Sequence, residues 1–202
     1  LEALVQVPTE QKNRHLSPDE TYQRGKQLLA EQYQLEFLPP MSYQNTYALA
    51  VKESYGASHQ LKTISDLKQV APNIRAGFSL ELQAAGITLK HIVSLEPALR
   101  YTALLNDKID LVEAFSTDAE LKQYQLRLLK DDISLFPAYQ GAPLMKAEFA
   151  EKNPQIVTAL NRLAGKISEE EMSEMNYRVK VQGESAENVA REYLEKNGLL
   201  GK

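Results

Sequence analysis

Strand and helix signals alternate along the middle of this 202-residue chain, and this alternation leaves few possible folds. Short apolar runs typical of buried strands are separated by helix starts, such as the turn at Thr63–Asp66 and the proline at position 97. The pattern predicts an open α/β sheet whose strands are joined by right-handed crossovers. The expected strands are Thr46–Val51, Ile74–Phe78, His91–Leu95, Ile109–Phe115 and Leu126–Leu129.

Helix signals dominate both flanks of this middle segment. Ser17–Glu20 is typical of a helix start, because Ser17 can cap the helix and Glu20 can return a capping-box bond. Further helix starts are expected at Asn153–Pro154, at Ser168 with Glu171, and at Ser185, and short extended segments at Leu35–Leu38 and Ala142–Met145.

Two turn-rich segments, Tyr43–Tyr47 and Pro137–Pro143, bracket the α/β middle. Such segments suit a chain that leaves one lobe, builds a second and then returns. The sequence therefore predicts that residues 46–140 form lobe two, and that residues 1–45 and 141–202 together form a discontinuous lobe one.

Composition and motifs exclude several kinds of function. The 23 basic and 27 acidic residues are scattered, so no basic stripe indicates a nucleic-acid partner. The absence of cysteine excludes a thiolate metal site and a cysteine nucleophile, and His15, His59 and His91 lack metal-ligand spacing. The glycines are isolated and no G-x-S-x-G motif occurs. We therefore expect no catalytic residue, no metal and no cofactor.

Aromatic residues gather at the turns and strand ends. They can be half-buried core residues whose hydroxyls reach water. Alternatively, several ring faces can surround a quaternary ammonium, each contributing about 0.5–2 kcal/mol, so that three or four rings give micromolar binding. The residues alone leave both interpretations open. The rings concerned are those of Tyr43, Tyr47, Phe115, Phe136 and Tyr139.

Several blocks of this sequence closely resemble the substrate-binding proteins of osmoprotectant ABC importers, which are receptors for glycine betaine, carnitine and choline. The resemblance covers essentially the whole chain. It implies a two-lobed type II periplasmic-binding-protein-like fold, with two crossover segments and a ligand in an aromatic cage between the lobes. The matching blocks are Asn45–Val51, Glu96–Tyr101, Ala114–Asp118, Phe136–Met145, Leu163–Ile167 and Met175–Tyr177.

The resemblance also implies a function and partners. The chain would be a receptor, not an enzyme, that captures a small quaternary amine and delivers it to a membrane permease. The permease would be a separate subunit or a fused domain, and the receptor would lie at the extracytoplasmic face of the bacterial cell membrane. A receptor for ergothioneine, which some relatives bind, is one alternative. A regulatory effector-binding domain of the same fold is another.

Family motifs assign roles to individual residues. Tyr47 and Tyr139 would be walls of the cage, and Asn45 would supply a polar contact. Phe115 stands where the family commonly has tyrosine, so its ring can serve the cation without the hydroxyl. Thr117 and Asp118 would fix the crossover or cap the next helix rather than touch the ligand.

The sequence departs from the family pattern in two places. The family's first lobe begins upstream of Leu1 with a segment that carries another cage tyrosine, so we expect lobe one to be incomplete at the N-terminus. Where the family commonly has an Arg-x-Asp-Gly loop, Glu81 runs directly into the residues that match Gln83 onward. In the family that loop commonly carries the arginine that pairs with a betaine carboxylate. Arg100 would be an alternative partner for the carboxylate, or, on a helix beside Tyr101, a structural residue.

Overall fold

The computed structural model describes residues 16–77, 82 and 86–200. Its contacts divide the chain into two compact units. Unit 1 comprises Leu1–Thr46 and Pro137–Lys202, and unit 2 is Tyr47–Phe136. The predicted α/β class is confirmed. The expected lobe boundaries, after residues 45 and 140, stay a prediction, and the two units divide after Thr46 and Phe136.

Unit 2 is built on a five-stranded mixed sheet in the order β4-β3-β5-β2-β6. The expectation of crossovers throughout is wrong for β2, because β2 runs antiparallel to both of its neighbours, β5 and β6. Among the five named strands of the described residues, only β3 forms parallel pairs, with β4 and β5. Alternating strand and helix signals do not show which strands become neighbours, so they do not fix strand direction. The strands are β2 Tyr47–Lys52, β3 Arg75–Ala76, β4 His91–Ile92, β5 Leu111–Phe115 and β6 Leu126–Leu129.

Short helices connect these strands. The helix expected after Thr63 is a single stretch of 3-10 helix, and the helix expected after Pro97 begins as another. The strands expected at residues 74–78 and 91–95 are shorter than predicted, and Phe78 lies outside the described residues. The helices of unit 2 are α2 Glu53–Ser58, η2 Ser65–Gln69, η4 Pro97–Leu99, α3 Arg100–Leu105 and α4 Ala119–Gln123.

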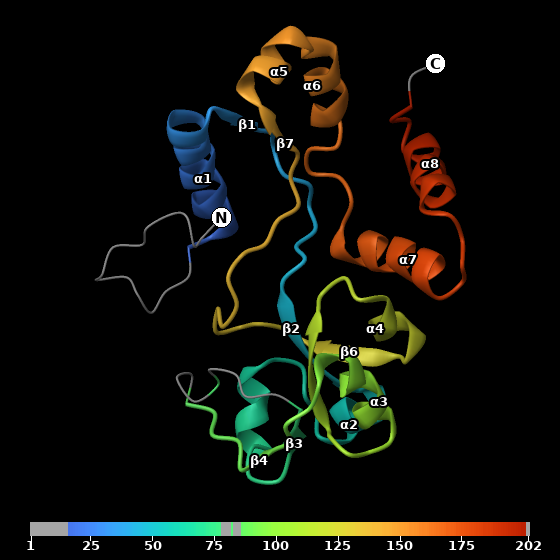
Figure 1. Ribbon diagram of the computed structural model, residues 1–202. Helices are drawn as coiled ribbons and strands as arrows, with labels where there is room; N and C mark the ends of the chain where they lie inside the picture. Colours follow the sequence, from blue (N-terminus) through green and yellow to red (C-terminus); the bar gives the residue numbers. More distant parts are fainter. Residues whose placement is uncertain (1–15, 78–81, 83–85, 201–202) are drawn as a thin grey trace. The chain divides into compact units, whose positions relative to one another are not determined.

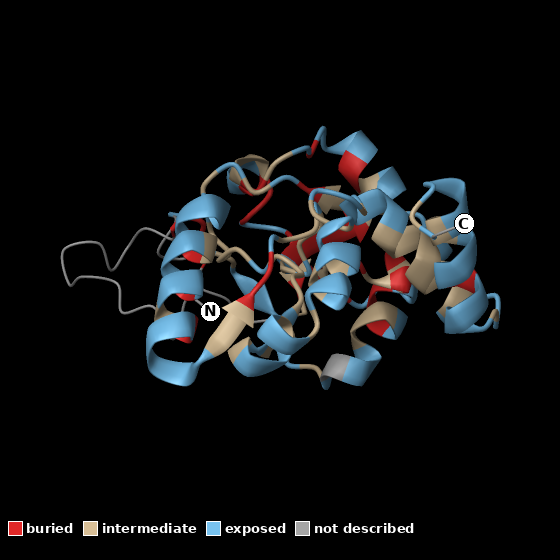
Figure 2. Ribbon diagram, turned by 90° about the horizontal axis from the view of Figure 1, so that it is seen from above, coloured by how far each residue is buried: buried red, intermediate tan, exposed pale blue. Residues whose placement is uncertain are grey.

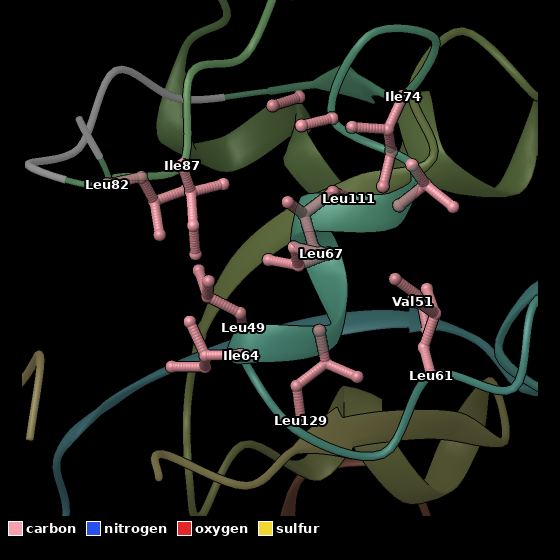
Figure 3. Packing of buried hydrophobic residues seen from close by; sticks show 13 residues of the cluster. Leu49, Val51, Leu61, Ile64, Leu67, Ile74, Leu82, Ile87, Leu111 and Leu129 are labelled. Carbon is pink, nitrogen blue, oxygen red and sulfur yellow. The ribbon is translucent and has the colours of Figure 1, made fainter. Parts of the chain in front are cut away.

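The two faces of this sheet carry two hydrophobic clusters, because successive side chains of a strand point to opposite faces. Leu49, Val51 and Leu111 belong to the larger cluster, where they pack with the residues shown in Figure 3. Ala50 and Val112, one position along, belong to the second cluster, which α3 and α4 cover. The core of unit 2 therefore holds the sheet rigidly from both sides.

Unit 1 contains a two-stranded sheet and the remaining helices (Figure 1). The predicted capping box at Ser17 is confirmed, since its Oγ accepts from Glu20 N at 3.2 Å and Glu20 Oε2 accepts from Ser17 N at 3.0 Å. A second box joins Ser168 and Glu171, as predicted. The elements are α1 Pro18–Tyr33, β1 Leu35–Phe37, β7 Leu144–Lys146, α5 Ala147–Lys152, α6 Pro154–Asn161, α7 Glu169–Lys180 and α8 Ala186–Lys196.

The helices of unit 1 are largely exposed. Among the described residues, none in α5, α6 or α7 is buried, and Figure 2 colours most helical surface as exposed. In the part of the chain that the structure describes, no helix is both long and apolar enough to cross a membrane.

The two turn-rich segments lie side by side and continue the pairing of β1 with β7. Leu38 N donates to Pro143 O at 3.0 Å, and Asn45 N donates to Tyr139 O at 2.9 Å. Residues 35–46 and 137–146 thus form one antiparallel ribbon, which we call the crossover ribbon (Figure 1). It holds two of the predicted site residues, Asn45 and Tyr139, next to each other.

Candidate functional site

Three aromatic rings form a group at one end of the sheet of unit 2. Tyr47 pairs with Phe115 in the register of β2 and β5, and their ring centroids are 5.0 Å apart. The ring of Phe136 lies 6.2 Å from that of Tyr47. We call Tyr47, Phe115 and Phe136 the ring group. Two of its members, Tyr47 and Phe115, are residues that the family motifs single out.

The strands place these rings at the edge of the core. Leu49 and Val51 share the sheet face of Tyr47 but are fully buried, whereas Tyr47 is 38% exposed. Phe136 packs against the larger cluster, and the Asp131 carboxylate holds the turn before it by accepting from Phe136 N at 3.0 Å. The rings are therefore anchored on a rigid core and remain partly open to solvent.

One carboxylate organises the residues around Phe115. Asp118 Oδ2 accepts from Arg100 Nη2 at 2.9 Å, from Tyr101 Oη at 2.5 Å and from Phe115 N at 3.0 Å. The Arg100 guanidinium lies 5.1 Å from the ring centroid of Tyr101 and 5.7 Å from that of Phe115. Burial, together with the hydrogen bond to Asp118, holds the pKa of Tyr101 well above its ordinary value. Tyr101 therefore stays protonated and donates to Asp118.

A second carboxyl lies on the sheet face of the ring group. Glu113 lies two residues from both Leu111 and Phe115 along β5, so the three side chains share one face, and Glu113 pairs with Leu49 on β2. Burial raises the pKa of Glu113, and the positive charge of Arg100 opposes that rise. The positive charge of Arg100 thus interacts with two carboxyl groups, those of Glu113 and Asp118.

A separate cavity of about 300 Å³ lies within unit 1 beside the crossover ribbon. Tyr139 is 46% exposed, and Tyr22 and Phe37 form a ring pair with centroids 5.2 Å apart. No charged side chain occurs among the described residues that line it, so its walls offer rings, amides and hydroxyls. These residues are Pro18, Thr21, Tyr22, Phe37, Pro40, Tyr43, Asn45, Ala138, Tyr139, Gln140 and Gly141.

Tyr43 packs closely on the ribbon beside this cavity. A Cβ at Gly141 would overlap the Oη and Cζ atoms of Tyr43, so only glycine leaves room for the ring. Tyr139 N also lies 3.3 Å from Gln44 Oε1, which accepts its hydrogen bond. Backbone pairing and ring packing together fix the position of Tyr139 within unit 1.

A larger cavity, about 470 Å³, lies between α7 and α8 and differs in character. Its lining combines four glutamates with Arg178 and Lys196, and Arg178 forms ion pairs with Glu184 and Glu192. It contains none of the predicted site residues. Among the described residues, no three His, Cys, Asp or Glu side chains lie together so as to hold a metal ion.

The structure divides the predicted site residues into two groups. Tyr47 and Phe115 lie together in unit 2, and Asn45 and Tyr139 lie together in unit 1. Arg100 lies beside Phe115, where it forms an ion pair with Asp118. The junction after Glu81 lies outside the described residues.

Sequence reasoning did not single out several residues near these groups. Glu113 could have been found from the alternation of side chains along its strand, which places it on the face of Phe115. Tyr22 and Phe37 lie outside the blocks that match the family, so no motif pointed to them. Both line the cavity because α1 packs against β1, and neither of these elements contains a block that matches the family.

An α/β chain of two units joined by two crossover segments has the architecture of periplasmic-binding-protein-like receptors. The model of the OpuAC family, described as the substrate binding domain of ABC-type glycine betaine transport systems, matches residues 15–196, and the chain belongs to this family. A crystal structure of a glycine betaine/carnitine/choline ABC transporter superposes with a TM-score of 0.86 at 27% identity, covering 98% of this chain and 74% of that one.

Curated relatives carry related descriptions. The chain is 32% identical over 195 residues to the carnitine transport binding protein OpuCC of Listeria monocytogenes, covering 91% of this chain and 63% of the relative. It is 29% identical over 185 residues to the ergothioneine transport permease/ergothioneine binding protein EgtU of Helicobacter pylori, covering 86% of this chain and 34% of the relative. The chain thus spans less than two thirds of the length of these proteins.

Proposed function

We propose that this chain is the substrate-binding component of an ABC importer and that it captures a quaternary-amine compatible solute of the glycine betaine, carnitine or choline type. The observation that carries the proposal is the ring group, in which the ring of Tyr47 lies 5.0 Å from that of Phe115 and 6.2 Å from that of Phe136, with all three partly open to solvent. Family membership supports the same class of ligand.

A trimethylammonium group has no hydrogen-bond donor, so the attraction of ring faces is the main way to bind it selectively. Each ring contributes about 0.5 kcal/mol when exposed and about 2 kcal/mol when the contact is desolvated. In the proposal, Tyr47 and Phe115 from unit 2 and Tyr139 from unit 1 form an aromatic cage around the same ligand. Asn45, which is fixed beside Tyr139, supplies a polar contact.

The proposal includes a partner and a location. A solute receptor acts by releasing its ligand to a permease, so we propose a membrane permease as the partner, either a separate subunit or a fused domain. The relative EgtU, described as both permease and binding protein, supports the fused arrangement. The receptor would lie at the extracytoplasmic face of the bacterial cell membrane, and its role is binding rather than catalysis.

Ergothioneine is the second candidate ligand. It carries the same trimethylammonium group, and EgtU is described as an ergothioneine-binding protein. Phe115 lacks the hydroxyl that the family commonly places there, so recognition of the remainder of the ligand depends on other residues.

Titration calorimetry of the purified protein with choline, glycine betaine, carnitine and ergothioneine tests the proposal. We expect micromolar binding of at least one of them, and a matching rise in melting temperature, because a ligand that binds only the folded state stabilises it. Ethanolamine and glycine, which lack the N-methyl groups of choline and glycine betaine, serve as controls and should not bind. Absence of binding by all four quaternary amines would contradict the proposal.

A further inference from the structure

The carboxylate of Asp118 lies between the ring group and a positive charge. Its Oδ2 atom accepts from the backbone N–H of Phe115 and from the guanidinium of Arg100, at 3.0 and 2.9 Å. Both charged side chains are only 20% exposed, so solvent screens their interaction weakly. One carboxylate thus holds the backbone of a ring-group residue and neutralises the cation beside it.

The position of Arg100 makes its charge relevant to a ligand. Its guanidinium carbon lies 5.7 Å from the ring centroid of Phe115, within the range of cation–π attraction. A ligand cation at the ring group would therefore approach a second cation that belongs to the protein. Two like charges repel, and the repulsion is strong where water is excluded. Binding of a purely cationic ligand requires that the charge of Arg100 be compensated.

We infer that Asp118 determines the preference of the site between cationic and zwitterionic quaternary amines, by neutralising Arg100 beside Phe115. The inference rests on the proposed function and concerns ligand choice within it. Asp118 acts through Arg100 and Phe115 and is therefore a positioning and specificity-determining residue. With Asp118 ionised, the ion pair is neutral and a cation such as choline is tolerated. Without that charge, Arg100 repels choline and attracts the carboxylate of glycine betaine.

Choline and glycine betaine are a matched pair of probes, because both carry a trimethylammonium group and only betaine carries a carboxylate. The substitution Asp118→Asn keeps an oxygen that can accept from Phe115 N but removes the negative charge. We expect it to weaken choline binding at least about tenfold, and to leave betaine binding within about threefold or to tighten it. Titration calorimetry at constant ionic strength measures both affinities.

Two further variants separate charge from structure. Arg100→Gln leaves the Asp118 charge uncompensated, so the ratio of choline to betaine affinity should move in the opposite direction. The double variant Asp118→Asn/Arg100→Gln removes both charges and should return the ratio to that of the wild type. Asp110→Asn is the matched control, because Asp110 is a partly buried carboxylate paired with Arg75 on β3, and it should leave the ratio unchanged.

The outcomes distinguish the inference from the function on which it rests. Equal weakening of both ligands in Asp118→Asn, with no return of the ratio in the double variant, would show a merely structural role and overturn the inference. If the wild type binds only one of the two probes, its response to Asp118→Asn still decides: choline binding should fall, whereas betaine binding should persist. A wild type that binds no quaternary amine overturns the proposed function before any variant is made.

Discussion

Phe115 lies directly opposite Tyr47 on the neighbouring antiparallel strand, with the two ring centroids 5.0 Å apart and the ring planes inclined by 32°. Rings in this arrangement stabilise each other and present a joint aromatic surface. Because the partners are fixed by the strand register, removing one ring changes the surface without displacing the strand on which the other lies. This makes Phe115 a suitable position for separating ring chemistry from packing.

Replacement of Phe115 by leucine should lower the affinity for the preferred quaternary amine about five- to tenfold, because leucine keeps an apolar side chain but has no ring face. Phe115→Tyr retains the ring and should keep the affinity within about threefold. Calorimetric titration of the two variants measures the difference. Unchanged affinity in Phe115→Leu would show that this ring does not contact the ligand.

Tyr139→Ala should weaken choline or betaine binding at least about tenfold, because a wall of the proposed cage is lost. Tyr139→Phe keeps the ring and should bind within about threefold of the wild type. Tyr33→Ala removes another exposed tyrosine, at the end of α1, and serves as a control that should leave affinity unchanged. The cage assignment for Tyr139 fails if its alanine variant titrates like the wild type.

Gly141→Ala should destabilise the protein by about 1–3 kcal/mol, because the new Cβ overlaps the ring of Tyr43 and forces it to move. The same substitution in a Tyr43→Ala background should cost less, since the obstructing ring is absent. A double-mutant cycle by urea denaturation measures this coupling. Additive effects of the two substitutions would show that the ring moves aside without cost.

Glu113→Gln should stabilise the protein at neutral pH. Burial raises the folded-state pKa of Glu113 above the ordinary value of 4.5, so the folded chain binds this proton more tightly than the unfolded chain. Wild-type stability is therefore lost as pH rises from about the ordinary value through the folded-state value. The melting temperatures of the variant and the wild type should agree below pH 4 and diverge above it. A difference that is the same at all pH values would not come from this ionisation.

Local features of the fold were predictable from the sequence. The capping boxes at Ser17 and Ser168 depend only on residues three positions apart, so their residues are visible as a short motif. The central strand β2 was also expected nearly in place, because its run of apolar residues is buried on both faces. Its antiparallel direction was not predictable, since it depends on contacts with β5 and β6 that lie far along the chain.

In the candidate site, too, local motifs were predictable from the sequence and long-range contacts were not. Family motifs pointed to Tyr47 and Phe115, but their direct pairing follows from the strand register, which no single segment contains. Asp118 was expected to fix the crossover or cap the next helix; it stands at the N-cap position of α4, but its side chain makes no capping hydrogen bond there. Its contacts with Arg100 and Tyr101 join parts of the chain that are not close in sequence. Long-range hydrogen bonds of this kind leave no periodic signal.

The hydrogen bond from Thr46 Oγ1 to Pro137 O, 2.9 Å long, brings together the two points where the chain enters and leaves unit 2. A segment whose ends are adjacent can fold while both flanks are still disordered. Its folding brings those ends together, and this removes the loop-closure entropy that ribbon formation would otherwise cost. We therefore expect unit 2 to fold before the crossover ribbon forms. Because its two ends are adjacent, the segment Tyr47–Phe136 could be exchanged between relatives at Thr46 and Pro137. Such an exchange would transfer the ring group as a whole.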